Sequence, residues 1–348
     1  MPETTLVLAP NWLGDAVMAL PAIADVKRHA PGRRIVVAAR GSVASLFELA
    51  PDVDGVVTLE WKGDWRERTG LSADVARLRE VGADAAILLP NSFASAWLAW
   101  RARVPRRLGY AGDLRSWLLS RAVPKPGGSM HQGAYYQHLV RALGAPSGPL
   151  EPRLEVPMAD LEAARALMLQ RGWTGSGYLV ALAPGAAYGG AKRWPPSHYA
   201  KLAAALVRGS AIWCVIVGSA ADSATAGEVR EGMSPDTRVK ALDLTGATSL
   251  RTLAAVLALA DVCVSNDSGA MHVAGAVGTA LVAVFGPTNE RETAPLTRLD
   301  RPPRVVINPV SCRPCMLREC PIDHRCMKGL DWSVVYEAVD DVFAEEQA

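Results

Sequence analysis

The sequence predicts an α/β protein with two doubly wound domains, each built on a parallel sheet. Short apolar runs alternate with longer helical patterns, which is typical of consecutive βαβ units. The length of 348 residues exceeds that of one typical domain core. A stretch rich in Pro and Gly over residues 144–157 lies between the two halves and predicts a linker.

The apolar runs give the positions of the expected strands. They lie at residues 6–9, 35–39, 56–59 and 86–89 in the first half, and at 178–183, 213–217, 262–265, 281–285 and 305–307 in the second. A last helix is expected after a cap at Asp331, and its apolar face would hold Val334, Val335, Ala338, Val342 and Phe343. We therefore expect domains over 1–150 and 151–330, and a C-terminal helix over 331–348 whose return to the first domain stays open.

The composition argues against several classes of protein. Half of the residues are hydrophobic and 21% are charged, as in ordinary globular domains, and the net charge of +2 disfavours a nucleic-acid partner. No apolar run reaches the roughly 18 residues of a membrane span. The N-terminus lacks the features of a signal peptide, so we expect a cytoplasmic protein. The six cysteines are then expected to be reduced or metal-bound.

The loop after the first expected strand carries a candidate catalytic residue. Ligands of open parallel sheets bind beyond the carboxyl ends of the strands, and the strand at 6–9 leads into the sequence PNWLGD at 10–15. Asp15 falls at the entrance of a helix, where it is either an N-cap or a general base. The loop has one glycine and a bulky Trp12 in place of G-x-G-x-x-G, which disfavours an NAD-dependent oxidoreductase.

The loop after the strand at 178–183 has the composition of an anion site. Its sequence, PGAAYGGAKRWP at 184–195, contains three glycines that permit close approach of a ligand to the backbone. Lys192 and Arg193 offer adjacent positive charges to a phosphate. The alternative is a flexible surface loop with two solvated cations. Trp194 is expected to anchor the loop by packing against the core.

A second anion site is expected after the strand at 262–265, where the chain turns directly into a helix. The backbone N–H groups at Ser268 and Gly269 would face an anion at the helix N-terminus. Asp267 suits sugar hydroxyls or a helix cap, and His272 is either structural or directed at the same ligand. The two loops together predict a pyrophosphate pocket for a nucleotide-sugar.

A basic segment over 101–125 has two interpretations. It contains one acid, Asp113, and seven basic residues: Arg101, Arg103, Arg106, Arg107, Arg115, Arg121 and Lys125. Such a run is either a solvated face or a surface for an anionic acceptor near a membrane.

Four cysteines follow the last expected strand, at Cys312, Cys315, Cys320 and Cys326, with His324 among them. The first pair has metal-ligand spacing, so a structural zinc or iron and a reduced thiol cluster both stay open. We expect this cluster to lie away from the two anion-binding loops. Cys214 and Cys263 fall inside strand patterns and are expected in the core.

Four segments, at 10–22, 89–96, 184–195 and 266–288, together resemble the bacterial ADP-heptose:lipopolysaccharide heptosyltransferases, the heptosyltransferase II branch among them. The resemblance implies a GT-B fold, with two Rossmann-like domains facing across a cleft. The first domain would bind the acceptor and the second ADP-heptose. Asp15 would be the catalytic base, and the donor site would include Lys192, Asp267, Gly269 and His272.

The same resemblance implies an inverting transfer of heptose from ADP-L-glycero-D-manno-heptose to the first heptose of the lipopolysaccharide inner core. The acceptor would be lipid A–Kdo–heptose, reached by peripheral contact with the inner membrane. Catalysis would need no cofactor, and any metal at the cysteines would be structural. Three alternatives stay open: transfer to another core sugar or a protein hydroxyl, a nucleotide-sugar epimerase of similar fold, and a non-catalytic nucleotide-sugar binding protein.

Overall fold

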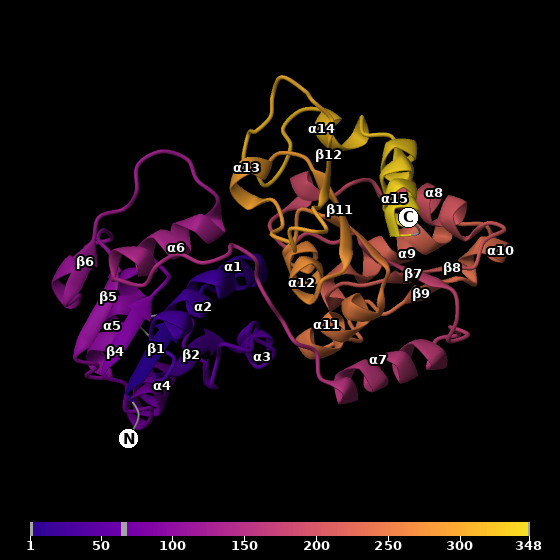
Figure 1. Ribbon diagram of the computed structural model, residues 1–348. Helices are drawn as coiled ribbons and strands as arrows, with labels where there is room; N and C mark the ends of the chain where they lie inside the picture. Colours follow the sequence, from indigo (N-terminus) through magenta and orange to yellow (C-terminus); the bar gives the residue numbers. More distant parts are fainter. Residues whose placement is uncertain (1–2, 64–67, 347–348) are drawn as a thin grey trace. The chain divides into compact units, whose positions relative to one another are not determined.

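The computed structural model describes residues 3–63 and 68–346 (Figure 1). By its internal contacts the chain divides into two compact units, Met1–Glu155 and Val156–Ala348. The boundary falls inside the stretch rich in Pro and Gly over 144–157. Each unit is built on its own parallel sheet, and the two are described separately below.

The sheet of the first unit has six parallel strands in the order β3-β2-β1-β4-β5-β6. The strands are β1 (Thr4–Leu8), β2 (Arg34–Arg40), β3 (Gly55–Leu59), β4 (Ala85–Leu88), β5 (Arg106–Tyr110) and β6 (Arg121–Val123). This is the strand order of Rossmann folds, in which the chain reverses direction of travel across the sheet between β1 and β4. Ligands of such sheets bind at that reversal, beyond the carboxyl ends of the strands.

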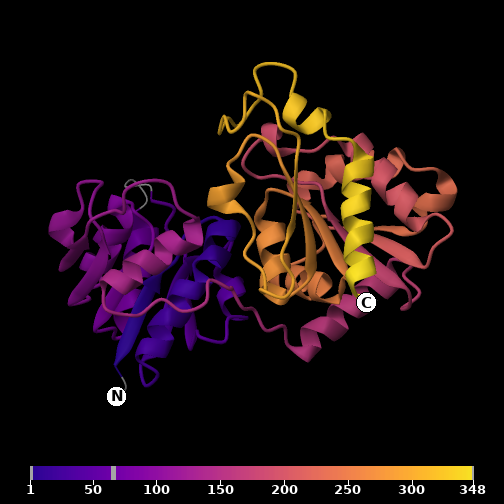
Figure 2. The same ribbon diagram turned by 45° about the horizontal axis from the view of Figure 1, so that its top comes forward.

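Helices cover both faces of this sheet (Figures 1 and 2). They are α1 (Leu13–Met18), α2 (Leu20–His29), α3 (Ala44–Phe47), α4 (Arg68–Glu80), α5 (Phe93–Arg101), the 3₁₀ helix η1 (Ser116–Leu118) and α6 (Gln132–Ala142). Side chains alternate between the faces of a strand. Leu6 and Leu8 accordingly enter one buried cluster with Leu78 of α4 and Leu98 of α5.

The second unit repeats the architecture with the strand order β12-β11-β10-β7-β8-β9. Its strands are β7 (Tyr178–Ala183), β8 (Ile212–Ile216), β9 (Ala241–Asp243), β10 (Val262–Asn266), β11 (Ala280–Phe285) and β12 (Arg304–Ile307). Read in chain order this is again the Rossmann arrangement, and the reversal lies between β7 and β10. The sequence-based prediction of doubly wound, Rossmann-like units is confirmed.

The helices of the second unit also lie on both faces of their sheet. They are α7 (Met158–Gln170), η2 (Gly190–Lys192), α8 (Pro196–Val207), η3 (Ala220–Asp222), α9 (Ser223–Glu231), α10 (Pro235–Arg238), α11 (Leu250–Leu259), α12 (Gly269–Val277), α13 (Glu290–Thr293), α14 (Arg325–Lys328) and α15 (Trp332–Glu346). One apolar core joins α8, α9 and α15 to strands β7, β8, β10 and β11. On the other face α11 packs against α7 and α12.

The strands expected from apolar runs agree with the structure to within one residue at each end, except that β1 begins two residues earlier than expected, at Thr4. Three strands were not expected: β5, β6 and β9. β5 opens with two arginines, while β6 and β9 are three-residue strands at sheet edges. Their sequences bury too few apolar side chains to produce a pattern.

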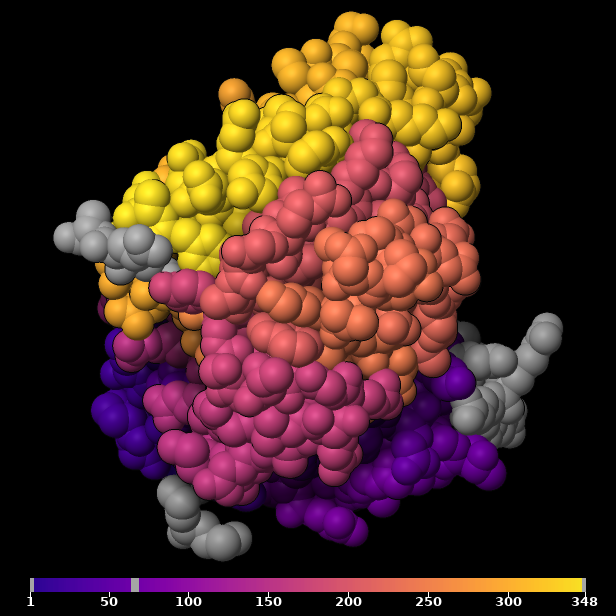
Figure 3. Space-filling view, turned by 90° about the vertical axis from the view of Figure 1, so that its right-hand side faces the viewer, coloured from indigo at the N-terminus to yellow at the C-terminus, as the bar shows by residue number. Residues whose placement is uncertain are grey.

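The last helix, α15, belongs to the second unit and packs along α8 (Figure 3). Asp331 caps it as expected, because its carboxylate accepts a hydrogen bond of 3.0 Å from the backbone N–H of Ser333. The predicted apolar face is partly wrong. Val334 is 45% exposed, whereas Val339, which was not expected to be buried, is fully buried.

Substitution of two valines tests which face of α15 is buried. Val339→Ala should lower the free energy of unfolding by about 1–2 kcal/mol, because it removes two methyl groups from a packed core. Val334→Ala should change it by less than about 0.5 kcal/mol, as surface substitutions do. Urea unfolding of the two variants measures both values. Equal losses would mean that the helix packs through a different face.

Candidate active site

Asp15 lies at the reversal point of the first sheet, just beyond the carboxyl end of β1. It is the third residue of α1 and is half-buried. The N-cap of that helix is Trp12, so the interpretation of Asp15 as an N-cap is wrong. The Tyr136 hydroxyl donates a hydrogen bond of 3.3 Å to the Asp15 carboxylate. The carboxylate is therefore held by a side chain from a distant part of the chain.

Tyr136 stays a neutral hydrogen-bond donor. Its side chain comes from α6 and is buried. Burial raises the pKa of its phenol well above the ordinary value, and the charge of Asp15 raises it further. Sequence reasoning missed Tyr136, because nothing in the pattern of α6 distinguishes it from the other tyrosine of that helix.

Arg115 of the basic segment is fully buried. Its guanidinium donates to the backbone carbonyl of Tyr110 at 2.9 Å, to Ser95 Oγ at 3.2 Å and to the carbonyl of Pro90. Burial lowers the pKa of Arg115 to about 10, so it remains charged at neutral pH. Arg115 is thus a clamp on the loop after β4, next to the same reversal point as Asp15, and does not belong to a surface.

The rest of the basic segment does not form one surface facing Asp15. Arg106 pairs with Asp84, and Arg107 donates to the carbonyls of Val104 and Leu118, both at 2.6 Å. These arginines stand at the start of β5, and Arg121 stands at the start of β6. In a parallel sheet the strand starts lie at the edge opposite Asp15. The hypothesis of one acceptor surface over 101–125 is therefore wrong.

In the second unit the two predicted loops meet at the reversal point. Lys192 follows β7 and Asp267 follows β10, and the Lys192 ammonium lies 2.6 Å from the Asp267 carboxylate. The Thr288 hydroxyl donates to the same carboxylate oxygen at 2.5 Å. The Lys192 ammonium also lies 4.7 Å from the centre of the Tyr188 ring. Asp267 is not a helix cap, because Ser268 holds the N-cap position of α12.

Asn266, the last residue of β10, fixes the Lys192 loop at both ends. Its buried amide donates to the carbonyl of Pro184 at 2.6 Å and accepts from the backbone N–H of Trp194 at 3.2 Å. The Tyr199 hydroxyl donates to the same amide oxygen at 3.1 Å. Trp194 is fully buried, as expected of a packing anchor. Sequence reasoning missed Asn266, although an amide that closes an apolar strand was a usable signal.

The other predicted donor residues cluster around this pair of loops. Ser268 makes no side-chain cap to α12, and Gly269 is the first residue of that helix. His272 is buried within α12. Arg193 follows Lys192, and its Nε atom is buried without a hydrogen-bond partner among the described residues. The backbone N–H groups of α12 and the Arg193 guanidinium are thus donors suited to an anion.

The three glycines of the Lys192 loop allow close contact with other parts of the protein. A Cβ atom on Gly185 would collide with the Asp222 carboxylate. One on Gly189 would collide with the backbone of Arg318, and one on Gly190 would lie 2.7 Å from a carboxylate oxygen of Glu319. The loop is therefore packed tightly on both sides.

The four clustered cysteines, Cys312, Cys315, Cys320 and Cys326, line one cavity of about 80 Å³ together with His324 and Ala191. All six cysteines of the chain are free. Among residues 3–63 and 68–346, no group of three or more His, Cys, Asp or Glu side chains is placed to hold a metal ion. The structure thus gives the expectation of zinc or iron no support. Burial raises the pKa of the Cys326 thiol, and the other three thiols raise it further.

The expected separation of this cluster from the anion-binding loops is wrong. Ala191, the neighbour of Lys192, lines the cysteine cavity. Figure 1 shows the chain between β12 and α14 at the end of the sheet where β11 leads to α13. Cys214 and Cys263 are core residues as expected, and burial raises the pKa of each to about 12.

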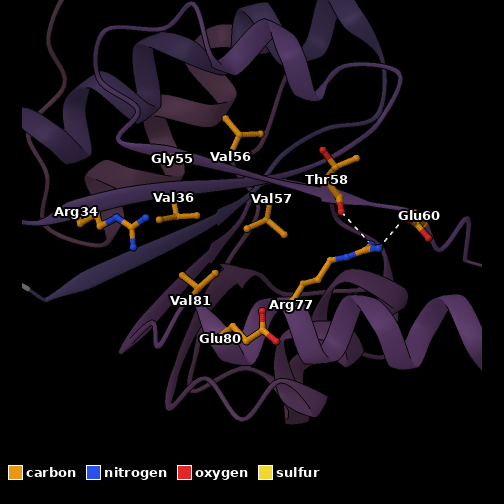
Figure 4. Close-up of a pocket in the computed structure, with 10 residues that line it drawn as sticks. All are labelled: Arg34, Val36, Gly55, Val56, Val57, Thr58, Glu60, Arg77, Glu80 and Val81. Atoms are coloured by element: carbon orange, nitrogen blue, oxygen red, sulfur yellow. Dashed lines mark hydrogen bonds and ion pairs between the residues drawn. The ribbon is translucent and has the colours of Figure 1, made fainter.

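A further cavity, of about 570 Å³, lies along β3 and α4 in the first unit (Figure 4). Arg77 donates to the Thr58 carbonyl and to the Glu60 carboxylate beside it. None of the predicted site residues lines this cavity. The predicted site residues therefore lie outside this cavity.

Comparison with known proteins shows the family of this chain. The family model described as glycosyltransferase family 9 (heptosyltransferase) matches residues 74–325. This chain belongs to that family. Lipooligosaccharide heptosyltransferase 2 of Haemophilus influenzae is 32% identical over 84% of this chain and 86% of its own length. Lipopolysaccharide heptosyltransferase 2 of Salmonella typhimurium is 32% identical over 86% of this chain and 88% of its own.

A solved structure supports the fold of this heptosyltransferase. The ADP-heptose lipopolysaccharide heptosyltransferase II of Escherichia coli matches with a TM-score of 0.85 and 27% identity, covering 99% of this chain and all of its own. The fold is the GT-B type of these glycosyltransferases. Among the residues that the structure describes, no helix is both long and apolar enough to cross a bilayer.

The role of Arg115 can be tested by stability. Arg115→Gln should lower the free energy of unfolding by about 2–3 kcal/mol, because buried carbonyls lose a charged donor. Arg106→Gln should cost at most about 1 kcal/mol, since it removes only an exposed ion pair. Chemical denaturation of both variants gives the comparison. If the Arg115 variant were as stable as the Arg106 variant, Arg115 would not be the clamp of this loop.

Proposed function

We propose that this chain transfers a heptose from ADP-L-glycero-D-manno-heptose to the first heptose of the lipopolysaccharide inner core. The observation that carries the proposal is the convergence of Lys192 and Asp267 at the reversal point of the second sheet. Family membership supplies the reaction class, and the heptosyltransferase 2 relatives favour this acceptor. The reaction releases ADP and inverts the configuration at the anomeric carbon.

On the donor side, Lys192, Arg193 and the N-terminus of α12 bind the pyrophosphate. As the bond to the anomeric carbon breaks, negative charge grows on the departing phosphate, and these groups stabilise it. The unpaired Nε of Arg193 and the uncapped N–H groups at Ser268 and Gly269 support this role. No metal or other cofactor is needed in this scheme, because fixed protein charges do the same work.

Asp267 and His272 complete the donor site in this proposal. The Lys192–Asp267 ion pair balances a buried carboxylate and keeps the lysine side chain in one place before ADP-heptose arrives. Asp267 then shares its remaining acceptor capacity with hydroxyls of the heptose. His272, buried one turn into α12, supports the same end of the helix.

On the acceptor side, Asp15 is the general base. It removes the proton from the attacking hydroxyl of the acceptor heptose, and that oxygen bonds to the anomeric carbon as ADP leaves from the opposite face. The hydrogen bond from Tyr136 orients the carboxylate. Tyr136 remains protonated throughout, so it does not compete for the proton.

Asp15→Asn should lower the turnover number by about 10²–10⁴-fold, because general-base assistance is lost while the shape is kept. The dissociation constant for ADP-heptose should stay within about threefold of the original, since the proposed donor-binding residues all belong to the second unit. Tyr136→Phe, a matched change beside it, should reduce turnover more mildly. Steady-state kinetics and calorimetry give both quantities, and near-normal turnover in Asp15→Asn would refute the assignment.

The decisive test of the function uses purified protein, ADP-heptose and a lipopolysaccharide core that ends after its first heptose. ADP release together with a one-heptose mass increase of the lipid is expected. A core lacking that first heptose should give neither product. ADP formation without any acceptor would contradict heptosyl transfer, and transfer to a protein hydroxyl would redirect the acceptor assignment.

We also propose peripheral contact with an anionic membrane, because the acceptor is a lipid. A ladder of aromatic rings begins at the carboxyl end of β4. Phe93 lies 6.1 Å from Trp97 and 6.2 Å from Trp117, and Trp97 lies 4.9 Å from Trp100. Trp100 and Trp117 are 41% and 66% exposed. Exposed tryptophans of this kind suit the boundary between lipid and water.

The double variant Trp100→Ser and Trp117→Ser should bind vesicles of phosphatidylglycerol and phosphatidylethanolamine at least about fivefold more weakly, since two interfacial anchors are lost. Leu299→Ser, which removes an apolar side chain 92% exposed in the second unit, is the control and should bind like the original. Vesicle sedimentation measures both. Unchanged binding of the double variant would exclude this face.

The proposed compartment is the cytoplasm, at the inner face of the inner membrane. Six free cysteines, two of them exposed, are compatible with a reducing environment. The proposed donor, an ADP-activated sugar, would reach the protein there.

A further inference from the structure

The segment over residues 309–330, which contains the four clustered cysteines and is called the cysteine segment below, holds the backbone of the Lys192 loop. The backbone N–H of Ala191 donates to the carbonyl of Arg318 at 2.9 Å. The N–H of Gly190 donates to the Glu319 carboxylate at 3.0 Å. In the opposite direction, the Ala191 carbonyl lies 2.7 Å from Nε2 of His324. Both polar backbone groups of the residue before Lys192 are thus bonded to this segment.

The cysteine segment also contacts the side chain of Tyr188, whose ring lies beside Lys192. The Tyr188 hydroxyl donates to the carbonyl of Met316 at 2.9 Å. The Arg318 guanidinium lies 5.1 Å from the centre of the Tyr188 ring, and the Lys192 ammonium lies 4.7 Å from it. The position of Lys192 therefore depends on the cysteine segment through its ring contact as well as through its backbone.

The cysteine segment is itself fixed to the second unit. The N–H groups of Cys315 and Met316 both donate to the carbonyl of Pro287 at 2.9 Å. Arg313 donates to the carbonyl of Gly286 at 2.9 Å. At the far end, Met327 is fully buried in the core of the unit. A segment anchored at both ends can transmit a fixed position to the loop that it contacts.

His324 contributes the side chain that bonds the cysteine segment to the Ala191 carbonyl. A carbonyl oxygen can only accept, so Nε2 of His324 carries the hydrogen and donates to Ala191. The residue has a backbone φ of 59°, and its N–H donates to the Cys320 thiol at 3.3 Å. The proposed reaction does not use His324, so these contacts of His324 have no role in it.

We propose that His324 is a positioning residue for Lys192. By holding the Ala191 carbonyl, it keeps the following lysine at the place where the phosphate charge of the donor develops. The proposal rests on the proposed donor site. Displacements of about 1 Å in a catalytic group can cost on the order of 10²-fold in rate, so one lost hydrogen bond in the supporting layer is sufficient to be measured.

The test compares His324→Leu with His324→Gln. Neither leucine nor glutamine is branched at Cβ, so both can adopt the backbone conformation of His324 about equally well. Only glutamine keeps an N–H donor near the position of Nε2. His324→Leu should lower the turnover number for heptosyl transfer by about 10–100-fold and weaken ADP binding. His324→Gln should restore both to within about threefold. Loss of equal size in both variants would overturn the proposal.

A double-mutant cycle separates positioning from general damage to the fold. In a Lys192→Ala background, His324→Leu should change turnover and ADP affinity by less than about twofold, because the group that it positions is gone. An undiminished effect in that background would show a role independent of Lys192 and would contradict the proposal.

The two proposals can fail separately. ADP binding, measured by calorimetry on the full-length protein, needs neither heptose nor acceptor. ADP affinity could show the expected double-mutant cycle between His324 and Lys192 while the protein transferred no heptose. The proposed function would then be wrong and the role of His324 would stand. If the His324→Leu variant transferred heptose at the normal rate, the proposed function would stand and the role of His324 would be wrong.

Discussion

The buried amide of Asn266 is the constraint on which the donor site depends. It closes β10 and bonds to both ends of the loop that follows β7, so two loops at the reversal point have one fixed relation. The Lys192 side chain is then held in one conformation by its ion pair with Asp267. Ordering a lysine side chain costs up to about 2 kcal/mol, and this cost is met on folding, before any ligand binds.

The two units place opposite chemistry at equivalent points of the same topology. The first unit presents a carboxylate with a neutral tyrosine as its partner. The second presents cations and the N-terminus of α12. A transfer that takes a proton from one substrate and leaves negative charge on another needs this division. Rossmann-like units suit it, because the proposed site residues follow the strands at which the strand order reverses. These strands are β1 in the first unit, and β7 and β10 in the second.

The sequence was sufficient to predict what local patterns encode. Apolar runs gave most strands, and the residues just after them included Asp15, Lys192 and Asp267. It was not sufficient for contacts between distant segments. Tyr136 reaches Asp15 across 121 positions, and His324 reaches Ala191 across 133. A charge run likewise did not reveal that Arg115 points inward while its neighbours face the opposite sheet edge, since only the folded strands separate the two.

In the proposed reaction, the charge of Lys192 at the reversal point of the second sheet stabilises the departing phosphate. Single-turnover transfer by Lys192→Ala, compared with Lys201→Ala on the exposed side of α8, tests it most directly. We expect a loss of about 10²–10³-fold in the chemical step for the first variant, the usual effect of removing one such group, and no change for the second. Transfer by Lys192→Ala at the original rate would contradict it.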